Sequence, residues 1–261
     1  MAPSLQLARP RLDPFGLIWT LVRTEFKVRY HRTVLGFFWA LLRPTAMVVV
    51  LASVFSFLFA DQPHYRLELL VGMFLWDFFA DSTKTGLISL HAKAYLLTKT
   101  PFPRWVMVVT SFSNAIITLV VVCTATVVIL WAVGRPVTPL TVSLFACYVL
   151  CLVVMVVGIS LGTSVLFLRY RDLNQVWEVA IHAGFFLSPV VYPMGAIPER
   201  YHFLLYLWPP TPVIQFSRAV LIDGVPPTLK AHLLLLLETL VVLGIGIEMF
   251  RRHAPKIAER L

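Results

Sequence analysis

The sequence has little charge. Only 13% of its 261 residues are Asp, Glu, Lys or Arg, whereas 59% are hydrophobic. A folded soluble chain covers its surface with polar side chains and typically carries about 25% charged residues. The shortage of charge therefore excludes a soluble enzyme and indicates that the chain lies in a lipid bilayer.

The sequence also lacks the motifs of several kinds of site. It contains no Gly-x-x-x-x-Gly-Lys-Ser/Thr loop, so it cannot hold the phosphates of ATP in a P-loop. It has no Gly-x-Ser-x-Gly turn of the kind that presents a serine nucleophile. We therefore expect no catalytic residue, no metal ion and no cofactor on this chain.

Three further features are scarce or absent. The cysteines are Cys123, Cys147 and Cys151, and they lie in apolar runs, so we expect inert packing residues rather than disulfides. The first 14 residues contain two Arg, three Pro and no apolar core, which argues against a cleavable signal peptide. The sequence shows no internal repeat of the kind found in many secondary transporters.

Long uncharged runs predict membrane-spanning helices. A span needs about 20 apolar residues, and uncharged runs of 30, 33 and 20 residues follow Arg104, Arg135 and Glu178. The stretch 68–90 gives a weaker signal because it contains charged residues. We predict an all-α integral membrane protein that forms one domain over 1–261. Its six spans are expected at about 36–60, 68–90, 105–133, 142–168, 176–195 and 231–250.

The distribution of basic residues predicts the orientation. The chain has 22 Lys and Arg against 13 Asp and Glu. With the N-terminus inside, the cytoplasmic segments hold 16 of the basic residues and the outer segments hold 5. Basic loops stay on the cytoplasmic side, so we expect both termini to be cytoplasmic. The net charge of +9 then reflects topology, and we expect no nucleic acid partner.

Residues 15–32 predict an amphipathic helix before the first span. Its apolar residues, such as Trp19 and Phe26, recur at helical spacing on one side, whereas Arg23 and Lys27 lie away from that stripe. Such a helix lies in the membrane interface. It acts either as a membrane anchor alone or also as the frame of a docking site for a cytoplasmic partner.

The segment 91–104 is the main cytoplasmic loop. It carries the apolar residues Tyr95, Leu96 and Leu97, and prolines bracket Phe102. A plain connector needs only a few residues, and exposed apolar residues favour a protein contact. We expect apolar anchors to dominate that contact, with charges at its rim, such as Lys93, mattering less.

The outer segment 196–224 predicts two short helices. Leu204 to Trp208 is too short to span, three prolines interrupt the chain at 209, 210 and 212, and Val213 to Ile222 follows. Prolines stop helices, and non-helical backbone at membrane depth requires cover from protein or water. We expect a re-entrant segment that lines or gates a path, and an interfacial cap is the alternative.

Three charged residues fall inside the second predicted span. Asp77, Asp81 and Lys84 stand at i, i+4 and i+7, so they share one helix face. Charges within the membrane indicate a functional site. Proton coupling is one interpretation, and a water-lined or mutually neutralised face is the other. His182 in the fifth span is expected to be a hydrogen-bonded packing residue.

Four segments carry a family resemblance. They are FKVRYHRTVLGFFWALLRP (26–44), LLTKTPFPRW (96–105), YRDLNQVWEVAIHAGFFLSPVVYP (170–193) and YLWPPTPVIQFSRAVLIDG (206–224). In order and spacing they resemble the type-2 ATP-binding-cassette (ABC) permeases that export polysaccharides. Two positions depart from that pattern: Arg43 stands where the family usually has a small polar residue, and Trp208-Pro209 replaces Asn-Pro.

The resemblance implies a transmembrane subunit of an ATP-driven exporter in the cytoplasmic (inner) membrane of a bacterium. Its substrate would be a lipid-linked polysaccharide such as O-antigen or teichoic acid. The resemblance also implies a homodimer and two copies of a separate cytoplasmic ABC ATPase, which would hold the ATP and Mg.

These considerations divide the candidate residues into three groups. The expected ATPase-coupling residues are Arg23, Lys27, Tyr95, Leu96, Leu97, Phe102 and Arg104. The expected path or gate residues are Phe38, Trp39, Tyr192, Pro193, Leu204, Trp208 and Arg218. The polar intramembrane residues are Asp77, Asp81 and Lys84.

Other functions stay open. The chain is alternatively a permease of the same class for a drug or small lipid, or a proton-coupled carrier that uses Asp77 and Asp81. A membrane-embedded lipid enzyme would need converging polar residues, and Arg171 with Asp172 is too small a set.

Overall fold

The computed structural model describes residues 14–30, 36–95 and 103–254. Within these ranges every regular element is a helix, and none of the residues described forms a strand. The longer helices are α1 (Pro14–Tyr30), α2 (Phe38–Phe55), α3 (Tyr65–Ala92), α5 (Arg104–Ser111), α6 (Ser113–Ala132), α7 (Pro139–Phe167), α8 (Leu173–Leu187) and α11 (Leu229–His253). Short elements between α8 and α11 are η1 (Met194–Ala196), η2 (Glu199–Tyr201), α9 (His202–Tyr206), α10 (Pro210–Arg218) and the π-helical turn η3 (Ala219–Asp223).

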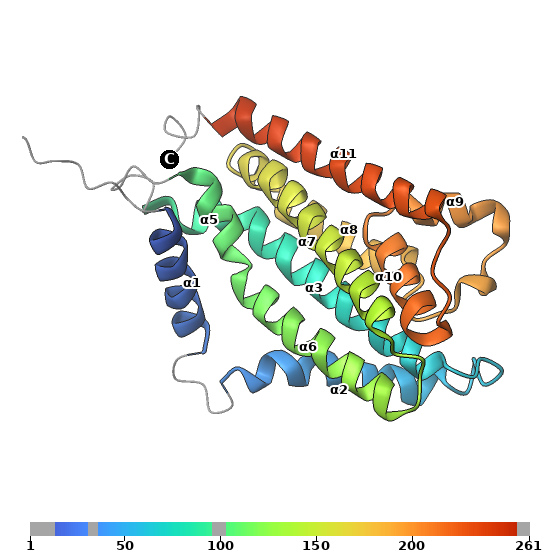
Figure 1. Cartoon of the computed structure of the whole chain (residues 1–261). Helices are drawn as coiled ribbons and strands as arrows, with labels where there is room; N and C mark the ends of the chain where they lie inside the picture. The colour runs from blue at the N-terminus through green and yellow to red at the C-terminus, as the bar shows by residue number, and fades with distance from the viewer. Residues whose placement is uncertain (1–13, 31–35, 96–102, 255–261) are drawn as a thin grey trace, which may run out of the picture.

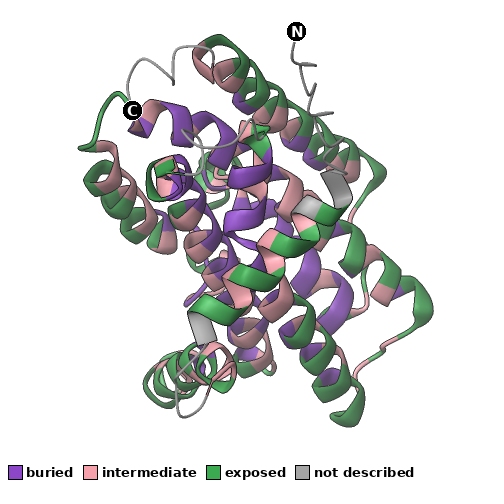
Figure 2. Cartoon of the chain, turned by 90° about the vertical axis from the view of Figure 1, so that its left-hand side faces the viewer, coloured by how far each residue is buried: buried purple, intermediate pink, exposed green. Residues whose placement is uncertain are grey.

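Helix α3 occupies the centre of the bundle. It contacts α2, α5, α6, α7, α8 and α10, and Figure 1 shows it running between α6 and α7. Its buried apolar residues include Leu69, Val71, Met73 and Leu75, which at helical spacing lie on several sides of the helix. Figure 2 shows buried residues concentrated in the middle of the bundle and exposed residues on the outer helices. The most polar of the predicted spans is therefore the one that neighbouring helices surround.

Helices α7 and α11 pack side by side at close range. Contact between α7 and α11 is the most extensive helix pairing. A Cβ atom added to Gly158 would lie 2.7 Å from the Cα of Leu243, and one added to Gly246 would overlap the carbonyl group of Gly158. Small residues allow membrane helices to approach this closely. The glycines therefore fix the distance between the two helices.

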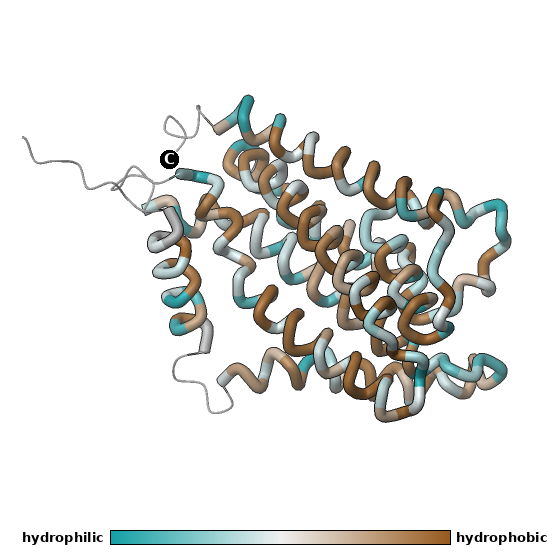
Figure 3. Tube along the Cα trace, viewed as in Figure 1, coloured by the Kyte–Doolittle hydropathy of each residue, from teal (hydrophilic) through white to brown (hydrophobic). Residues whose placement is uncertain are grey.

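Four helical stretches of the described chain are long and apolar enough to cross a membrane: Phe38–Phe55, Arg104–Ala132, Pro139–Phe167 and Leu229–His253. Figure 3 shows that hydrophobic residues dominate along α6, α7 and α11, with hydrophilic residues at their ends. These stretches match four of the six predicted spans. The chain is thus a multi-pass integral membrane protein.

The other two predicted spans, α3 and α8, do not have both the length and the apolar composition of the four stretches above. Helix α3 has 28 residues and rises about 42 Å, enough to span, but it carries Asp77, Asp81 and Lys84 near its middle. Helix α8 has only 15 residues and rises about 22 Å, less than the roughly 30 Å of hydrocarbon. The expectation of a continuous helix over 176–195 was wrong, because the chain becomes extended at Ser188, directly before Pro189.

Other boundaries also shift. The first span ends at Phe55 rather than near residue 60, and Phe112 interrupts the third predicted span between α5 and α6. The fourth begins at Pro139, where the Thr138 side chain and Thr141 form a capping box. Two short helices are present in 196–224, as predicted, but α9 and α10 begin earlier than expected. Helix α10 starts at Pro210 and includes Pro212, because proline is tolerated in the first turn of a helix.

The bundle has two distinct ends. Figure 1 shows α1 at the same end as the start of α5 and the last turn of α11, and we call this the α1 end. The short helices α9 and α10 lie at the opposite end, which we call the α9 end. The helix predicted over 15–32 is confirmed as α1, and it contacts α5 and α6 rather than joining the bundle in parallel.

Candidate functional site

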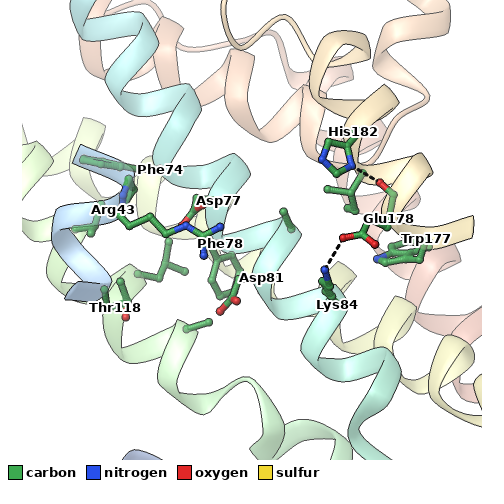
Figure 4. A pocket seen from close by; sticks show the side chains of 17 residues that line it. Arg43, Phe74, Asp77, Phe78, Asp81, Lys84, Thr118, Trp177, Glu178 and His182 are labelled. Atoms are coloured by element: carbon green, nitrogen blue, oxygen red, sulfur yellow. Dashed lines mark hydrogen bonds and ion pairs between the residues drawn. The ribbon is translucent and has the colours of Figure 1, made fainter. Parts of the chain in front are cut away.

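A polar cavity of about 470 Å³ lies among α2, α3, α6 and α8. Six of its lining residues carry ionisable side chains (Figure 4). The lining is formed by Ala40, Arg43, Pro44, Phe74, Asp77, Phe78, Ala80, Asp81, Lys84, Ala115, Thr118, Leu119, Val122, Trp177, Glu178, Ile181 and His182. Asp77, Asp81 and Lys84, which were predicted to share one face of a helix, all line this cavity from α3.

Charged residues from neighbouring helices complete the cluster. The Nζ of Lys84 lies 2.8 Å from Oε1 of Glu178 on α8. Figure 4 shows the Arg43 side chain extending from α2 toward Asp77 and Asp81. Both side chains of the Lys84–Glu178 pair are about half exposed, and exposed ion pairs are held only weakly because water screens their charges. The pair can therefore exchange partners at low cost.

Arg43, Glu178 and His182 also line the cavity, and none of them was predicted there from the sequence. Arg43 gave a signal, since an arginine inside an apolar segment needs an acidic partner or water. His182 was expected to be a packing residue, but it is exposed and lines the cavity, although its Nδ1 lies 2.7 Å from the carbonyl oxygen of Glu178 one turn earlier. The spacing of Asp77, Asp81 and Lys84 along their own helix could not show which other helices would contribute charged residues beside them.

The polar cavity cannot face lipid. Arg43, Lys84 and Glu178 are exposed on the isolated chain, and they belong to helices predicted to cross or enter the bilayer. Exposing such charges to hydrocarbon costs several kcal/mol each. This side of the protein therefore lies against water or against another polar protein surface.

A second polar cluster lies at the α1 end. The Nζ of Lys93 forms an ion pair with Oε1 of Glu25 on α1, at 2.7 Å. It also lies 3.3 Å from the carbonyl oxygen of Met107 and 3.4 Å from Oγ1 of Thr110. Lys93 is 9% exposed. The expectation that Lys93 is a rim charge was therefore wrong, because the residue is buried and joins α1, α3 and α5.

The predicted coupling residues lie around this cluster. Arg23 and Lys27 are exposed on α1, and Tyr95 is exposed just after α3. Arg104 donates a hydrogen bond to the carbonyl oxygen of Ala254, so the start of α5 is joined to the end of α11. Leu96, Leu97 and Phe102 lie outside the described residues.

Arg218 organises the α9 end. It is buried, its Nε donates to the carbonyl oxygen of Glu68 at 2.9 Å, and its two terminal nitrogens donate to those of Pro189 and Val190 at 2.6 and 2.8 Å. These three bonds join α10, the start of α3 and the chain after α8. Arg218 was predicted as a path or gate residue, and its place in the fold is inside this junction.

The remaining predicted path residues are spread along the bundle. Phe38 and Trp39 are exposed in the first turn of α2, whereas Leu204 is exposed on α9 near the opposite end. Trp208 packs edge-to-face on Phe79, with ring centroids 6.1 Å apart. Tyr192 donates a hydrogen bond to the carbonyl oxygen of Phe186 at 2.5 Å, and the adjacent Pro193 is partly exposed. One chain does not bring these residues into a single site.

The bundle of apolar helices and the polar cavity between them define a multi-pass membrane protein with ionisable side chains among its helices. Comparison with known sequences gives the family: the ABC-2 type transporter family matches residues 16–222, and the chain belongs to it. The relatives found are not enzymes by name but permease and transport proteins.

Three relatives illustrate the similarity. The chain is 28% identical over 251 residues to an O-antigen export system permease protein of Klebsiella pneumoniae, covering 95% of both chains. It is 26% identical over 264 residues to an O-antigen export system permease protein of Myxococcus xanthus, covering 98% of this chain and 100% of that protein. It is 22% identical over 233 residues to a polysialic acid transport protein of Escherichia coli, covering 87% and 89%.

Proposed function

We propose that this chain is the transmembrane subunit of an ATP-driven exporter that moves a lipid-linked polysaccharide across the cytoplasmic membrane of a bacterium. The similarity to O-antigen export permeases over nearly the full length of both proteins carries the proposal. The polar cavity supports it, because a sugar polymer needs a hydroxyl-binding surface at bilayer depth.

We infer six crossings, with α3 and α8 added to the four apolar helices and both termini in the cytoplasm. Helix α8 is too short to cross alone, and the proposal is that the segment from Ser188 to Pro193 completes its path to the far surface. The position of α1 and the end of α11 at one end of the bundle fits an even number of crossings (Figure 1).

We further propose a homodimer of twelve spans in which the polar sides of two copies face each other. The exposed charges of α2, α3 and α8 support this arrangement, because a second copy would shield them from lipid and enclose a polar path. Two copies of a cytoplasmic ATPase would bind at the α1 end, and the ATP and Mg would belong to those subunits.

The test is genetic complementation with a surface readout. A strain that lacks the native permease but retains its ATPase and glycan biosynthesis receives this chain, and surface polysaccharide is measured by antibody binding to intact cells. We expect display to be restored only when the ATPase can hydrolyse ATP. Restored resistance to a small toxic compound without restored glycan display would instead favour a drug or small-lipid exporter.

A further inference from the structure

Trp177 separates two cavities of opposite character. It lines the polar cavity described above, and it also lines an apolar groove of about 240 Å³ between α7 and α11. Its indole Nε1 donates to Oγ1 of Thr83 at 3.2 Å, which fixes the ring between α8 and α3. One side chain therefore forms part of the wall of both spaces.

The apolar groove suits a single hydrocarbon chain. Gly158 and Gly162 line it on α7, and Val242, Ile245 and Met249 line it on α11. Pockets for drug-sized ligands occupy about 300–1,000 Å³, and this groove is smaller, which favours one slender hydrocarbon chain over a bulky ligand. It lies within two helices that are apolar enough to span a membrane, where lipid chains are the available solvent.

The polar cavity on the other side of Trp177 can bind an anionic group close to the indole and sugar hydroxyls farther away. The Lys84–Glu178 pair joins the residues that directly follow Thr83 and Trp177, so the ammonium group lies beside the indole. This half-exposed pair can open at low cost to let Lys84 bind a phosphate oxygen. Farther along the same cavity lie Asp77, Asp81 and Arg43, whose oxygens and nitrogens can bind sugar hydroxyls (Figure 4).

We propose that the groove, Trp177 and the polar cavity form one binding site for a single-chain lipid phosphate that carries sugar. The chain lies in the groove, the phosphate linkage lies at Lys84, and the first sugars lie toward Asp77 and Asp81. The order of apolar, cationic and hydroxyl-binding surfaces matches the order of the three parts of such a ligand. The proposal rests on the proposed function and specifies where its substrate is held.

The test measures binding of farnesyl diphosphate to the permease–ATPase complex in phosphatidylcholine nanodiscs by calorimetry. Farnesol supplies the chain alone, inorganic diphosphate supplies the anion alone, and didecanoyl phosphatidic acid supplies a two-chain lipid. We expect farnesyl diphosphate to bind at least tenfold more tightly than any of the three. Equal binding of the two-chain lipid would identify a general phospholipid surface and overturn the proposal.

Matched variants test each part of the site. Ile245→Trp fills the groove from an exposed position and should weaken farnesyl diphosphate at least tenfold, whereas Ile247→Trp, exposed on the same helix outside the groove, should not. Lys84→Gln should weaken it at least fivefold, whereas Arg252→Gln, in an exposed ion pair on α11, should not. Unchanged affinity in Ile245→Trp or Lys84→Gln would contradict the proposal.

Tryptophan emission measures ligand binding independently of export, so a failure of this site can be told apart from a failure of the proposed function. Binding should change the tryptophan emission of the wild-type complex, and Trp177→Phe should remove most of that change while the complex stays assembled. If glycan display is normal but the complex binds no farnesyl diphosphate, this proposal fails and the proposed function stands. If binding follows the expected pattern but no glycan reaches the surface, the site stands and the export function fails.

Discussion

Glu25 on α1 and Lys93 at the end of α3 form an ion pair, with Oε1 and Nζ 2.7 Å apart. Lys93 is buried and also lies within hydrogen-bonding distance of α5. The interfacial helix is therefore joined to two helices of the bundle through one ammonium group. A force applied to α1 by a cytoplasmic partner would reach α3 and α5 directly.

This relationship predicts that charge reversal uncouples ATP hydrolysis from export. Glu25→Lys would place a second ammonium group beside that of Lys93, which is only about 11% exposed, so the repulsion should release α1 and reduce export at least tenfold. The double variant Glu25→Lys with Lys93→Glu should restore export only in part, because a carboxylate at 93 would repel the carbonyl oxygen of Met107. ATPase activity and glycan export of the reconstituted complex provide the measurement.

The exposed pair Glu248–Arg252 provides the matched control, since its two charges are one helical turn apart and largely in solvent. Exchanging those two residues should leave export unchanged. A Glu25→Lys variant with normal export would show that α1 is an anchor and carries no coupling.

Arg218 is predicted to be a stability residue of the α9 end. Arg218→Gln removes the positive charge and most of the guanidinium N–H groups that donate to three backbone carbonyls. Hydrogen bonds to charged groups contribute about 1.5–3 kcal/mol each. We expect a loss of at least about 3 kcal/mol and a clearly lower unfolding temperature in detergent. Arg66→Gln, at an exposed position on α3, should leave the unfolding temperature nearly unchanged.

Gly72 offers an independent check on the same junction. A Cβ atom there would overlap a terminal nitrogen of Arg218, so Gly72→Ala should displace the guanidinium and lower the unfolding temperature as well. A normal unfolding temperature in both variants would show that the three hydrogen bonds do not stabilise the junction.

Close packing of α7 and α11 predicts a difference between two nearby glycines. Gly246→Leu would force a side chain into the backbone of Gly158, whereas nothing lies within 4 Å of a Cβ added to Gly244. We expect Gly246→Leu to abolish folded protein in detergent and Gly244→Leu to be tolerated. Size-exclusion profiles of the two purified variants provide the comparison, and two identical profiles would argue against backbone contact.

Substitution of Asp77 in the polar cavity tests whether the protein is a proton-coupled carrier or an ATP-driven exporter. If Asp77 and Asp81 bind substrate rather than protons, Asp77→Asn should reduce export only moderately, by about tenfold or less, because the amide still binds hydroxyls. Export into inverted vesicles should continue after an uncoupler collapses the proton gradient, as long as ATP is present. Export that stops with the uncoupler at constant ATP would instead identify a proton-coupled carrier.

The loop residues Leu96 and Leu97 lie outside the described part of the chain, and their role stays a prediction from the sequence. Leu97→Asp should abolish ATPase binding and export, while the permease still inserts in the membrane, because buried apolar anchors dominate protein contacts. Co-purification of the ATPase with the variant measures the effect. Normal recovery of the ATPase would show that the loop is only a connector.

The sequence by itself determined the class of the protein, four of its spans and the short helices of the outer segment. These properties depend on composition and on local runs. A long uncharged stretch such as 136–168 is typical of a membrane-spanning helix, and Pro209 and Pro210 mark the break between α9 and α10. The spacing of Asp77, Asp81 and Lys84 likewise placed the three charges on one face, because helical periodicity is a property of a single segment.

Only the tertiary structure decided which residues of neighbouring helices contact each helix face. Periodicity gives no information on how one helix is rotated against its neighbour, so the partners of Lys84 and Lys93 came from α8 and α1 without a sequence signal. The same holds for Arg218, whose three acceptors are backbone carbonyls up to 150 residues away. Contacts between distant segments depend on packing geometry, which is why the polar cavity and the apolar groove beside Trp177 became visible only in the folded chain.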